Sequence, residues 1–278
     1  MSFLKRFARH RGALVGLAIL MVVIVFALVA PALFPQSPWR LVGRPFLAPF
    51  ALERFPLGTD TLGRDIAAGM VHGARVSLMI GVVSTLVALL IGVPIGALAG
   101  YAGGIVDDAL MRFTEFFQTI PSFALAIVLV AILQPKLGSI VLAIGVVSWP
   151  PVARLVRGEV LSLKSRDYVQ AAIAMGQTTP RIIVSQVLPN TLAPIIVMGS
   201  LMIGSAILLE SALSFLGLGD PNLMSWGYMV GAGRTRLLDA WWISFFPGVA
   251  IFLTVLALNL AGEGLNDALN PRLAGGRA

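Results

Sequence analysis

Long apolar runs constrain the fold of this chain more than any other feature of its sequence. The first run covers residues 12–34, and others follow along the whole chain. A bilayer core is about 30 Å thick and takes about 20 helical residues to cross, and a helix satisfies its own backbone where lipid offers no hydrogen-bond partner. Hydrophobic residues make up 58% of the chain and charged residues 12%, about half the charge usual in soluble domains. We therefore predict an all-α polytopic membrane protein with about six transmembrane helices.

Apolar runs and basic residues together predict the topology. Lysine and arginine gather before the first run and after the fourth, which places both regions in the cytoplasm. The first run exceeds the apolar core of about 7–15 residues found in signal peptides, so we expect an uncleaved helix. We expect cytoplasmic segments at 1–11, 102–117, 158–190 and 262–278, external segments at 35–75 and 216–240, and spans at 12–34, 76–101, 118–133, 139–157, 191–215 and 241–261. Both termini are then cytoplasmic.

The residue inventory excludes several classes of function. Cysteine is absent, which excludes disulfides, thiolate metal sites and cysteine nucleophiles. The two histidines, His10 and His72, are far apart, so we expect neither a histidine metal centre nor a Ser-His dyad. The net charge of +7 comes from scattered residues without interleaved aromatics, which argues against nucleic-acid binding. No Gly-x-x-x-x-Gly-Lys-Ser/Thr loop occurs, so we expect no catalytic residue, no metal and no nucleotide on this chain.

Two competing classes of function conflict with the same residues. An intramembrane enzyme would need Ser200, Ser205 or Ser211 as its nucleophile, but no span contains a histidine to activate one. These serines are better interpreted as small helix-packing residues. A self-contained secondary transporter would be expected to carry paired broken segments in inverted halves, and the sequence lacks them. Both classes are therefore disfavoured.

Glycines and prolines inside the spans predict close packing and bends. In the second span, Gly92, Gly96 and Gly100 recur at four-residue intervals, a stripe that lets helix backbones approach closely. The third span is expected to break near Pro121. Pro150 and Pro151 lie in the middle of the fourth span and predict a bend there. That bend either shapes a translocation gate or is a structural feature that neighbouring helices compensate.

The polar stretch 167–190 predicts a helix-turn-helix in a cytoplasmic segment. Asp167 opens the first helix as its N-cap, and Gly176 closes it in the left-handed conformation. Thr179 caps the second helix, with Pro180 at the first helical position. On the first helix we expect a slim face formed by Ala171, Ala172 and Ala174. On the second we expect an apolar stripe formed by Val184, Val187 and Leu188.

This stretch resembles the EAA loop in the membrane subunits of ABC importers. The family pattern is Glu-Ala-Ala, three residues, Gly, nine residues and then Ile-x-Leu-Pro. The matching residues here are Gln170, Ala171, Ala172, Gly176, Leu188 and Pro189. Gln170 replaces the glutamate and Gln186 the isoleucine, so no role that needs a charge at position 170 is carried over. The resemblance implies a coupling helix that sits in a groove of an ATPase subunit, and the alternative is an ordinary interfacial amphipathic helix.

Three further stretches resemble the dipeptide, oligopeptide and nickel importer permeases, in particular their second permease type, the C subunit. They begin at Arg54 (RFPLGTDTLGRDIAAGMVHGARVSL), Met111 (MRFTEFFQTIPSFALAIVLVAIL) and Leu208 (LLESALSFLGLGDPNLMSWG). The resemblance implies a type I importer fold in a bacterial or archaeal cytoplasmic membrane. It also implies a second homologous permease, two ATPase subunits that bind ATP and Mg, and an extracytoplasmic substrate-binding protein. The solute itself is left open between a dipeptide, an oligopeptide, glutathione and a nickel chelate.

Glu210 is the ionisable residue of the fifth span. It lies about 18 residues from the cytoplasmic end, roughly 27 Å along a helix, and therefore near the outer boundary. Two interpretations stay open: a gate carboxylate that meets a cationic group of the solute, or a structural partner of Arg234 or Arg236 in the adjoining loop. We favour the structural interpretation because it needs no second assumption.

Overall fold

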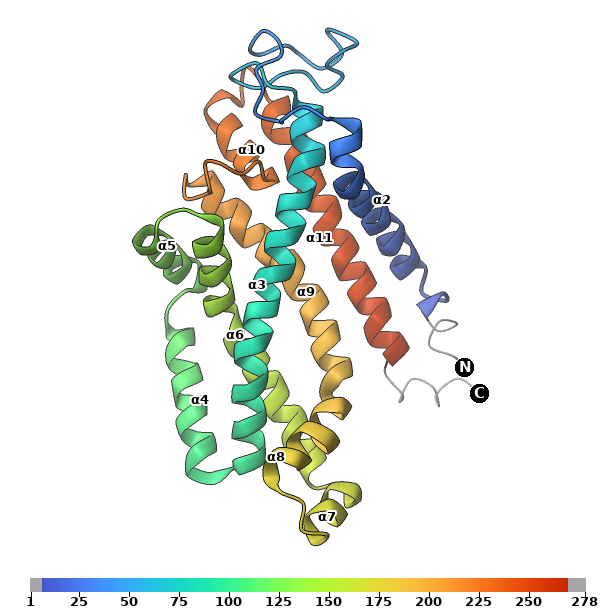
Figure 1. The fold of residues 1–278 in the computed structure, drawn as a ribbon, viewed down its shortest axis with the longest axis vertical. Coiled ribbons are helices and arrows are strands. Elements are labelled where there is room, and N and C mark those ends of the chain that lie inside the picture. Colours follow the sequence, from blue (N-terminus) through green and yellow to red (C-terminus); the bar gives the residue numbers. More distant parts are fainter. Residues whose placement is uncertain (1–6, 270–278) are drawn as a thin grey trace.

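The computed structural model describes residues 7–269, and its regular elements are all helical. They are α2 (Arg11–Leu33), α3 (Ile66–Ala102), α4 (Gly104–Thr119), α5 (Ser122–Leu133), α6 (Leu137–Lys164), α7 (Asp167–Ala174), α8 (Thr179–Ile182), a π-helical turn (Ile183–Val187), α9 (Leu188–Phe215), α10 (Trp226–Gly233), a 3-10 turn (Arg234–Arg236) and α11 (Trp242–Leu269). The molecule is elongated, with α7 and α8 at one end and the irregular segment between α2 and α3 at the other (Figure 1).

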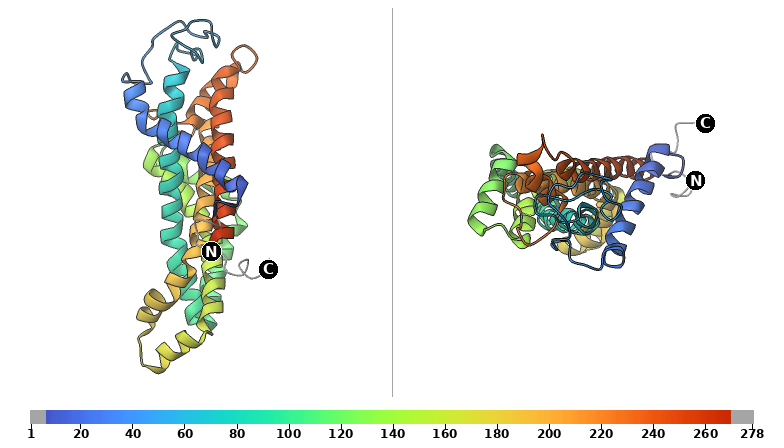
Figure 2. Two further views of the ribbon diagram at one scale, coloured as in Figure 1. Left: turned by 90° about the vertical axis from the view of Figure 1, so that its right-hand side faces the viewer. Right: turned by 90° about the horizontal axis from the view of Figure 1, so that it is seen from above.

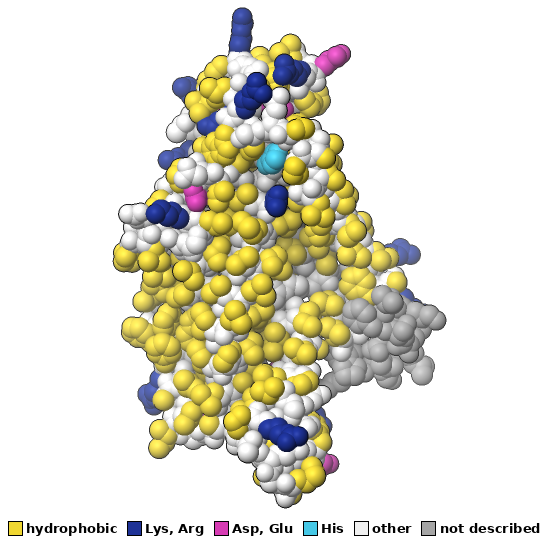
Figure 3. Space-filling model, in the orientation of Figure 1, with side chains coloured by type: hydrophobic (Ala, Val, Ile, Leu, Met, Phe, Trp, Pro, Cys, Tyr) yellow, Lys and Arg dark blue, Asp and Glu magenta, His cyan; other side chains and the backbone are white. Residues whose placement is uncertain are grey.

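Several of these helices are long and apolar enough to cross a membrane. Within residues 7–269 there are five such helical runs, namely α2, α3, α6, the run Thr179–Phe215 and α11, and the bent pair α4 and α5 forms a sixth if it counts as one span. Apolar side chains cover the middle of the face shown in Figure 3, whereas lysine and arginine lie mainly toward its two ends. The prediction of an all-α polytopic protein with about six spans is confirmed.

Helix α3 forms the centre of the bundle and packs most extensively against α6 (Figures 1 and 2). The two backbones touch along the predicted glycine stripe. A Cβ atom at Gly92 would lie 2.8 Å from the Trp149 carbonyl oxygen. At Gly96 it would lie 2.3 Å from the Ala153 oxygen, and at Gly100 it would lie 2.8 Å from the oxygen of Arg157, one further turn along α6. The prediction that these glycines serve close packing is confirmed.

The third expected span, 118–133, differs from the structure. Helix α4 already begins at Gly104, inside the expected loop 102–117, and meets α5 at a break where the axis turns by 83°. Ile120 and Pro121 occupy this break, as expected, because proline has no N–H to continue the ladder of α4. Helix α5 has 12 residues, roughly 18 Å of helix, which is shorter than a bilayer core of about 30 Å.

Other helix ends also differ from the expected bounds. Helix α3 starts at Ile66, ten residues before the expected 76, because the Asp65 carboxylate accepts a hydrogen bond from the Ala67 N–H at 2.8 Å and caps it. The segment expected to be cytoplasmic, 158–190, is largely helical, since α6 runs to Lys164 and helix resumes at Thr179. The π-helical turn Ile183–Val187 just before Pro189 carries this helix into α9. Where each helix meets the membrane surface stays a prediction.

The irregular segment between α2 and α3 is folded tightly over the end of the bundle. Gly58 and Gly63 both have a φ of +81°, a left-handed conformation that glycine adopts without steric cost in tight turns. The hydroxyl of the buried Thr59 donates to the Arg44 carbonyl at 2.6 Å, and the Trp242 indole N–H donates to the Thr59 carbonyl at 3.2 Å. The segment is thereby fixed to the start of α11.

Candidate functional site

The predicted coupling segment consists of α7, the turn after it and α8 (Figure 1). The Gly176 φ is +74°, and the Gln177 N–H donates to the Ala172 carbonyl at 3.1 Å, so the predicted left-handed closure of the first helix is confirmed. The N-caps differ by one residue from the expectation. Arg166 rather than Asp167 precedes α7, and Thr178 rather than Thr179 precedes α8, with no side-chain cap at either end.

One face of the coupling segment is buried against the bundle. Val169 and Ala172 of α7 belong to the same buried apolar cluster as Ile182, Val187 and the α6 residue Val160. Ala172 lies against the bundle, whereas Ala171 and Ala174 are exposed, so the expected slim face of three alanines is not buried as a whole. The contact fixes the short α7 against the much longer α6.

The opposite face of the coupling segment leaves apolar side chains uncovered. Ile173 is 43% exposed and Met175 72%, and Val184, in the π-helical turn that follows α8, is 65% exposed. Of the expected apolar stripe, Val187 is buried whereas Val184 is exposed. Among the remaining site residues of the motif, Gln170, Ala171 and Pro189 are exposed and Leu188 is half-buried. The tip of the molecule therefore presents apolar side chains that the rest of the chain does not cover.

Polar contacts attach the coupling segment to the helices that carry it. The Gln170 side-chain amide donates to the Lys164 carbonyl at 2.9 Å and holds the corner between α6 and α7. The Lys164 ammonium in turn donates to the Tyr101 carbonyl at 2.5 Å, at the end of α3. Gln170 thus holds the corner through a neutral hydrogen bond, which needs no negative charge at this position.

An ion pair joins α4 to α6 nearer to the centre of the molecule. The Arg157 guanidinium makes two hydrogen bonds with the Asp107 carboxylate, at 2.6 and 2.7 Å, and the Asp107 side chain is 11% exposed. Such two-pronged contacts fix orientation as well as distance. No sequence pattern predicts this pair, because Asp107 and Arg157 are 50 residues apart and belong to different helices.

Pro150 and Pro151 lie in the middle of α6, which continues through them as one α-helix. Pro150 is buried and Pro151 is exposed. The adjacent Trp149 is 2% exposed and lies against the rings of Phe113 and Phe117, with centroids 5.9 and 5.3 Å away. The aromatic cluster thus fixes α4 against the proline-containing part of α6.

Glu210 belongs to α9 and is 2% exposed, and its carboxylate lies against the start of α10. Ser214 and Ser225 donate to its carboxylate at 2.8 and 2.7 Å, and the Ser211 hydroxyl lies 3.5 Å away. Glu210 makes no ion pair with any described residue, so the expected pairing with Arg234 or Arg236 is wrong: Arg234 instead donates to the Phe215 carbonyl, and Arg236 lies 3.8 Å from Asp239.

The hydroxyl groups around Glu210 connect three helices. Ser225 caps α10 by accepting a hydrogen bond from the Tyr228 N–H at 3.0 Å while its own hydroxyl donates to Glu210. The neighbouring Trp226 N–H donates to the Ser77 hydroxyl of α3 at 3.0 Å. A Cβ atom at Gly227 would lie 2.7 Å from the Glu210 carboxylate, so α10 approaches this carboxylate through a glycine. Glu210 therefore links α9 to α10, and its partners are serine hydroxyls rather than arginines.

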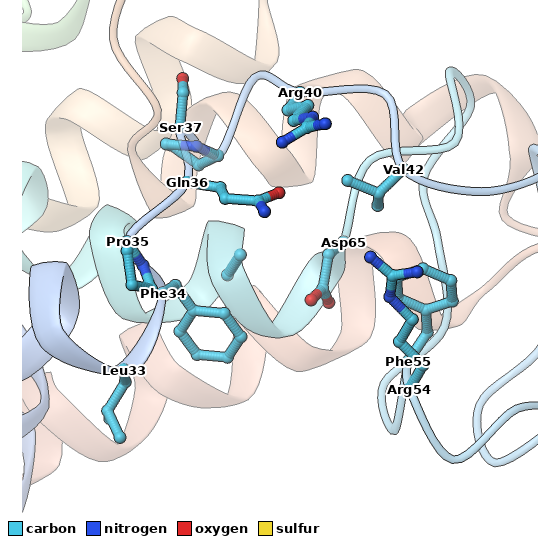
Figure 4. Close-up of a pocket in the computed structure, with 12 residues that line it drawn as sticks. Leu33, Phe34, Pro35, Gln36, Ser37, Arg40, Val42, Arg54, Phe55 and Asp65 are labelled. Carbon is cyan, nitrogen blue, oxygen red and sulfur yellow. The ribbon is translucent and has the colours of Figure 1, made fainter.

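A small pocket of about 230 Å³ lies where the irregular segment between α2 and α3 covers the bundle, at the opposite end of the molecule from α7 (Figure 1). Figure 4 shows the residues that line it. Arg40, Arg54 and Asp65 line it together with residues that follow α2. Burial raises the pKa of Asp65, while the two N–H groups that it caps and the Arg54 charge oppose this rise. No sequence pattern predicted this pocket, because its lining residues come together only when the segment after α2 folds over the start of α3.

Both histidines have structural contacts. His10 Nδ1 accepts from the Ala13 N–H at 3.0 Å and caps α2, and His72 Nε2 lies 3.0 Å from the Phe34 carbonyl. Within residues 7–269, no three histidine, cysteine, aspartate or glutamate side chains gather as metal ligands would. Both histidines thus contact the ends of α2.

Comparison with known proteins adds the family. Residues 92–275 match the family described as binding-protein-dependent transport system inner membrane component, and residues 2–59 match the N-terminal TM domain of oligopeptide transport permease C. The chain is 43% identical to the di/tripeptide transport system permease protein DppC of Pseudomonas aeruginosa over 98% of this chain and 92% of that protein. It is 42% identical to the dipeptide transport system permease protein DppC of Bacillus subtilis over 97% of this chain and 84% of that protein.

A solved structure confirms the expected type I importer fold. It is a chain of the MetNI methionine ABC transporter in an inward-facing conformation, with a TM-score of 0.60, 19% sequence identity and coverage of 70% of this chain and 93% of that chain. At this identity the likeness concerns the fold alone. The family match, which spans most of the chain, settles the identity: this protein belongs to the family of inner membrane components of binding-protein-dependent transport systems.

Proposed function

We propose that this chain is the permease subunit through which a binding-protein-dependent importer carries peptides. The permease names of its relatives, at about 40% identity over almost the whole chain, support the peptide class. In the proposed complex the chain pairs with a second homologous permease and receives its solute from an extracytoplasmic binding protein. Its termini and α7 face the cytoplasm of a bacterial or archaeal cell.

The uncovered face of the coupling segment is the observation that carries the proposed mechanism. Exposed apolar residues gather at the tip formed by α7 and α8, whereas the buried face of the same segment is fixed to α6. We propose that an ATPase subunit, one of two that bind ATP and Mg, covers Gln170, Ala171 and Met175 at this tip. Movement of the docked ATPase is then transmitted to α6 and α9, because both helices hold the segment. Nucleotide shifts the equilibrium only by binding the two states differently.

Co-purification together with uptake tests this proposal. The tagged wild-type chain should bring down ATPase chains and restore uptake of labelled dipeptides in a strain that lacks the gene. Met175→Asp places a charge in the proposed contact, where Met175 is 72% exposed, and should reduce ATPase recovery at least about tenfold. Leu238→Asp is the matched control, since Leu238 is 97% exposed and lies in the loop after α10. Equal recovery with both variants would refute docking at this tip, and restored uptake of nickel but not dipeptides would refute the peptide class.

A further inference from the structure

A hollow opens beside the break between α4 and α5, with the middle of α6 and α9 as its other walls. Its volume is about 510 Å³, within the range of about 300–1,000 Å³ usual for small-molecule sites. The residues that matter for its chemistry are Gln118, Ser122, Ser148, Met198, Met202 and Ser205. Pro150 and Pro151, midway along the 28-residue α6, also line it, so the hollow lies near the middle of the membrane-spanning bundle.

The polar side chains of the hollow are unpaired. Gln118 and Ser122 are exposed and Ser148 is half-buried, and none of the three makes a side-chain hydrogen bond within the described chain. Ser205 has only a 3.5 Å contact with the carbonyl of Leu201, one turn earlier in α9. Polar side chains at membrane depth normally face a bundle interior or a water-filled cavity, because lipid cannot pair with them. These side chains therefore indicate a polar occupant.

The backbone beside the hollow is equally unsuited to lipid. The axis turns by 83° between α4 and α5, and Pro121 at the turn has no N–H. The first turn of α5 has no side-chain cap. Irregular backbone at this depth is tolerated only where it is buried in protein or lines a water-filled cavity. The break and the side chains consequently indicate the same kind of occupant.

No ionisable residue lines the hollow. The Gln118 amide offers both donors and an acceptor, and the serine hydroxyls offer either. A peptide group needs one partner for its N–H and one for its C=O, so these uncharged side chains match the backbone of an extended peptide. Met198 and Met202 are flexible and polarizable, and methionine adapts to side chains of different shape.

Resting on the proposed function, we infer that this hollow is the surface on which the permease contacts the peptide during passage, and that it binds the peptide backbone through uncharged hydrogen bonds. A lipid chain or an apolar helix of the second permease would leave Gln118, Ser122 and Ser148 unpaired. The backbone of a peptide would form these hydrogen bonds whatever its side chains are. The passage should then be indifferent to the charge of the cargo.

Introducing a charge into the hollow tests this inference. Uptake of cationic, neutral and anionic dipeptides is measured in proteoliposomes with the complete complex and saturating binding protein, and each rate is divided by the wild-type rate for that peptide. Gln118→Glu should raise the ratio of cationic to anionic uptake about tenfold, which corresponds to about 1.4 kcal/mol, and Gln118→Lys should lower it similarly. Gln134→Glu, in the exposed turn after α5, is the matched control and should leave the ratio unchanged. A ratio that stays unchanged in both Gln118 variants would overturn the inference.

A second measurement covers variants that fail to assemble. The chain has no cysteine, so a single thiol at Ser148 can be labelled with a small water-soluble thiol reagent. Ser148→Cys should react with the reagent, and dipeptide should protect it during turnover. Leu142 is 51% exposed on the same helix but lies outside the hollow, and dipeptide should not change the labelling of Leu142→Cys. An unreactive Ser148→Cys, with and without ATP, would mean that lipid or a subunit seals the hollow and would overturn the inference. If the wild-type complex carries no dipeptide at all, the proposed function fails instead.

Discussion

Replacement of Gly96 by alanine tests how closely the two central helices must approach. The added Cβ would lie 2.3 Å from the Ala153 carbonyl oxygen and 2.9 Å from the Val156 Cβ. The nearest atom belongs to the backbone of α6, so it cannot move aside by a rotamer change. The axes of α3 and α6 must therefore separate locally, and the packing above and below Gly96 must loosen with them.

The expected magnitude follows from two opposing effects. Alanine stabilises a helix interior by about 1 kcal/mol relative to glycine, whereas overpacking a tight contact costs about 1–3 kcal/mol. Gly96→Ala lies at the upper end of that cost, because a backbone oxygen is the obstacle, and its net loss is roughly 2 kcal/mol. Gly158→Ala, on α6 itself, is the matched control. Its Cβ would have no neighbouring atom within 4 Å, so this variant gains the helix preference alone. The two variants should differ by roughly 2–4 kcal/mol.

Thermal unfolding of the purified protein in detergent, followed by tryptophan fluorescence, provides the measurement. The unfolding midpoints should rank Gly158→Ala, then wild type, then Gly96→Ala, with the extremes separated by roughly 5–10 °C for a chain of this size. Gly92→Ala and Gly100→Ala should fall below wild type as well, because each would contact α6 at less than 3 Å. A midpoint for Gly96→Ala at or above that of Gly158→Ala would show that α3 and α6 are not in close contact in the membrane protein.

Three further predictions concern the coupling segment, Glu210 and topology. Gly176→Val forces a β-branched residue to a φ of +74° and should weaken ATPase co-purification, whereas Gly176→Asn should spare it; equal losses would argue against left-handed strain as the cause. Glu210→Gln replaces the carboxylate that accepts hydrogen bonds from the serine hydroxyls and should lower recovery of the complex, with all peptides transported equally poorly. Normal assembly with a selective loss of cationic-peptide transport would favour the gate interpretation instead. Ser165→Cys and Ser37→Cys each introduce an exposed thiol. In intact cells an impermeant maleimide should label the thiol at position 37 but not the one at position 165, and the reverse pattern would invert the topology.

Features that depend on local chemistry could be predicted from the residues alone. Apolar runs long enough to cross a bilayer predicted the all-α bundle, because lipid leaves the backbone no other means of satisfying its hydrogen bonds. Gly96 and its two neighbours in the stripe, like Gly176, were predicted correctly because glycine permits contacts and dihedral angles that other residues resist. Pro121 marked the break in the third span, since a missing N–H is a local property.

Which polar groups meet depends on how the helices pack, and no sequence pattern predicted it. Of the two interpretations open for Glu210, the favoured one was a partnership with Arg234 or Arg236, whereas the fold brings Glu210 the Ser225 hydroxyl at 2.7 Å. The ion pair of Asp107 with Arg157 and the hollow that joins Gln118 to Ser148 likewise depend on how α4 is rotated against α6. Helix periodicity indicates which residues share a face, but the packing of side chains between helices sets the rotation and height at which two faces meet. Contacts between distant residues are therefore fixed by the packed bundle.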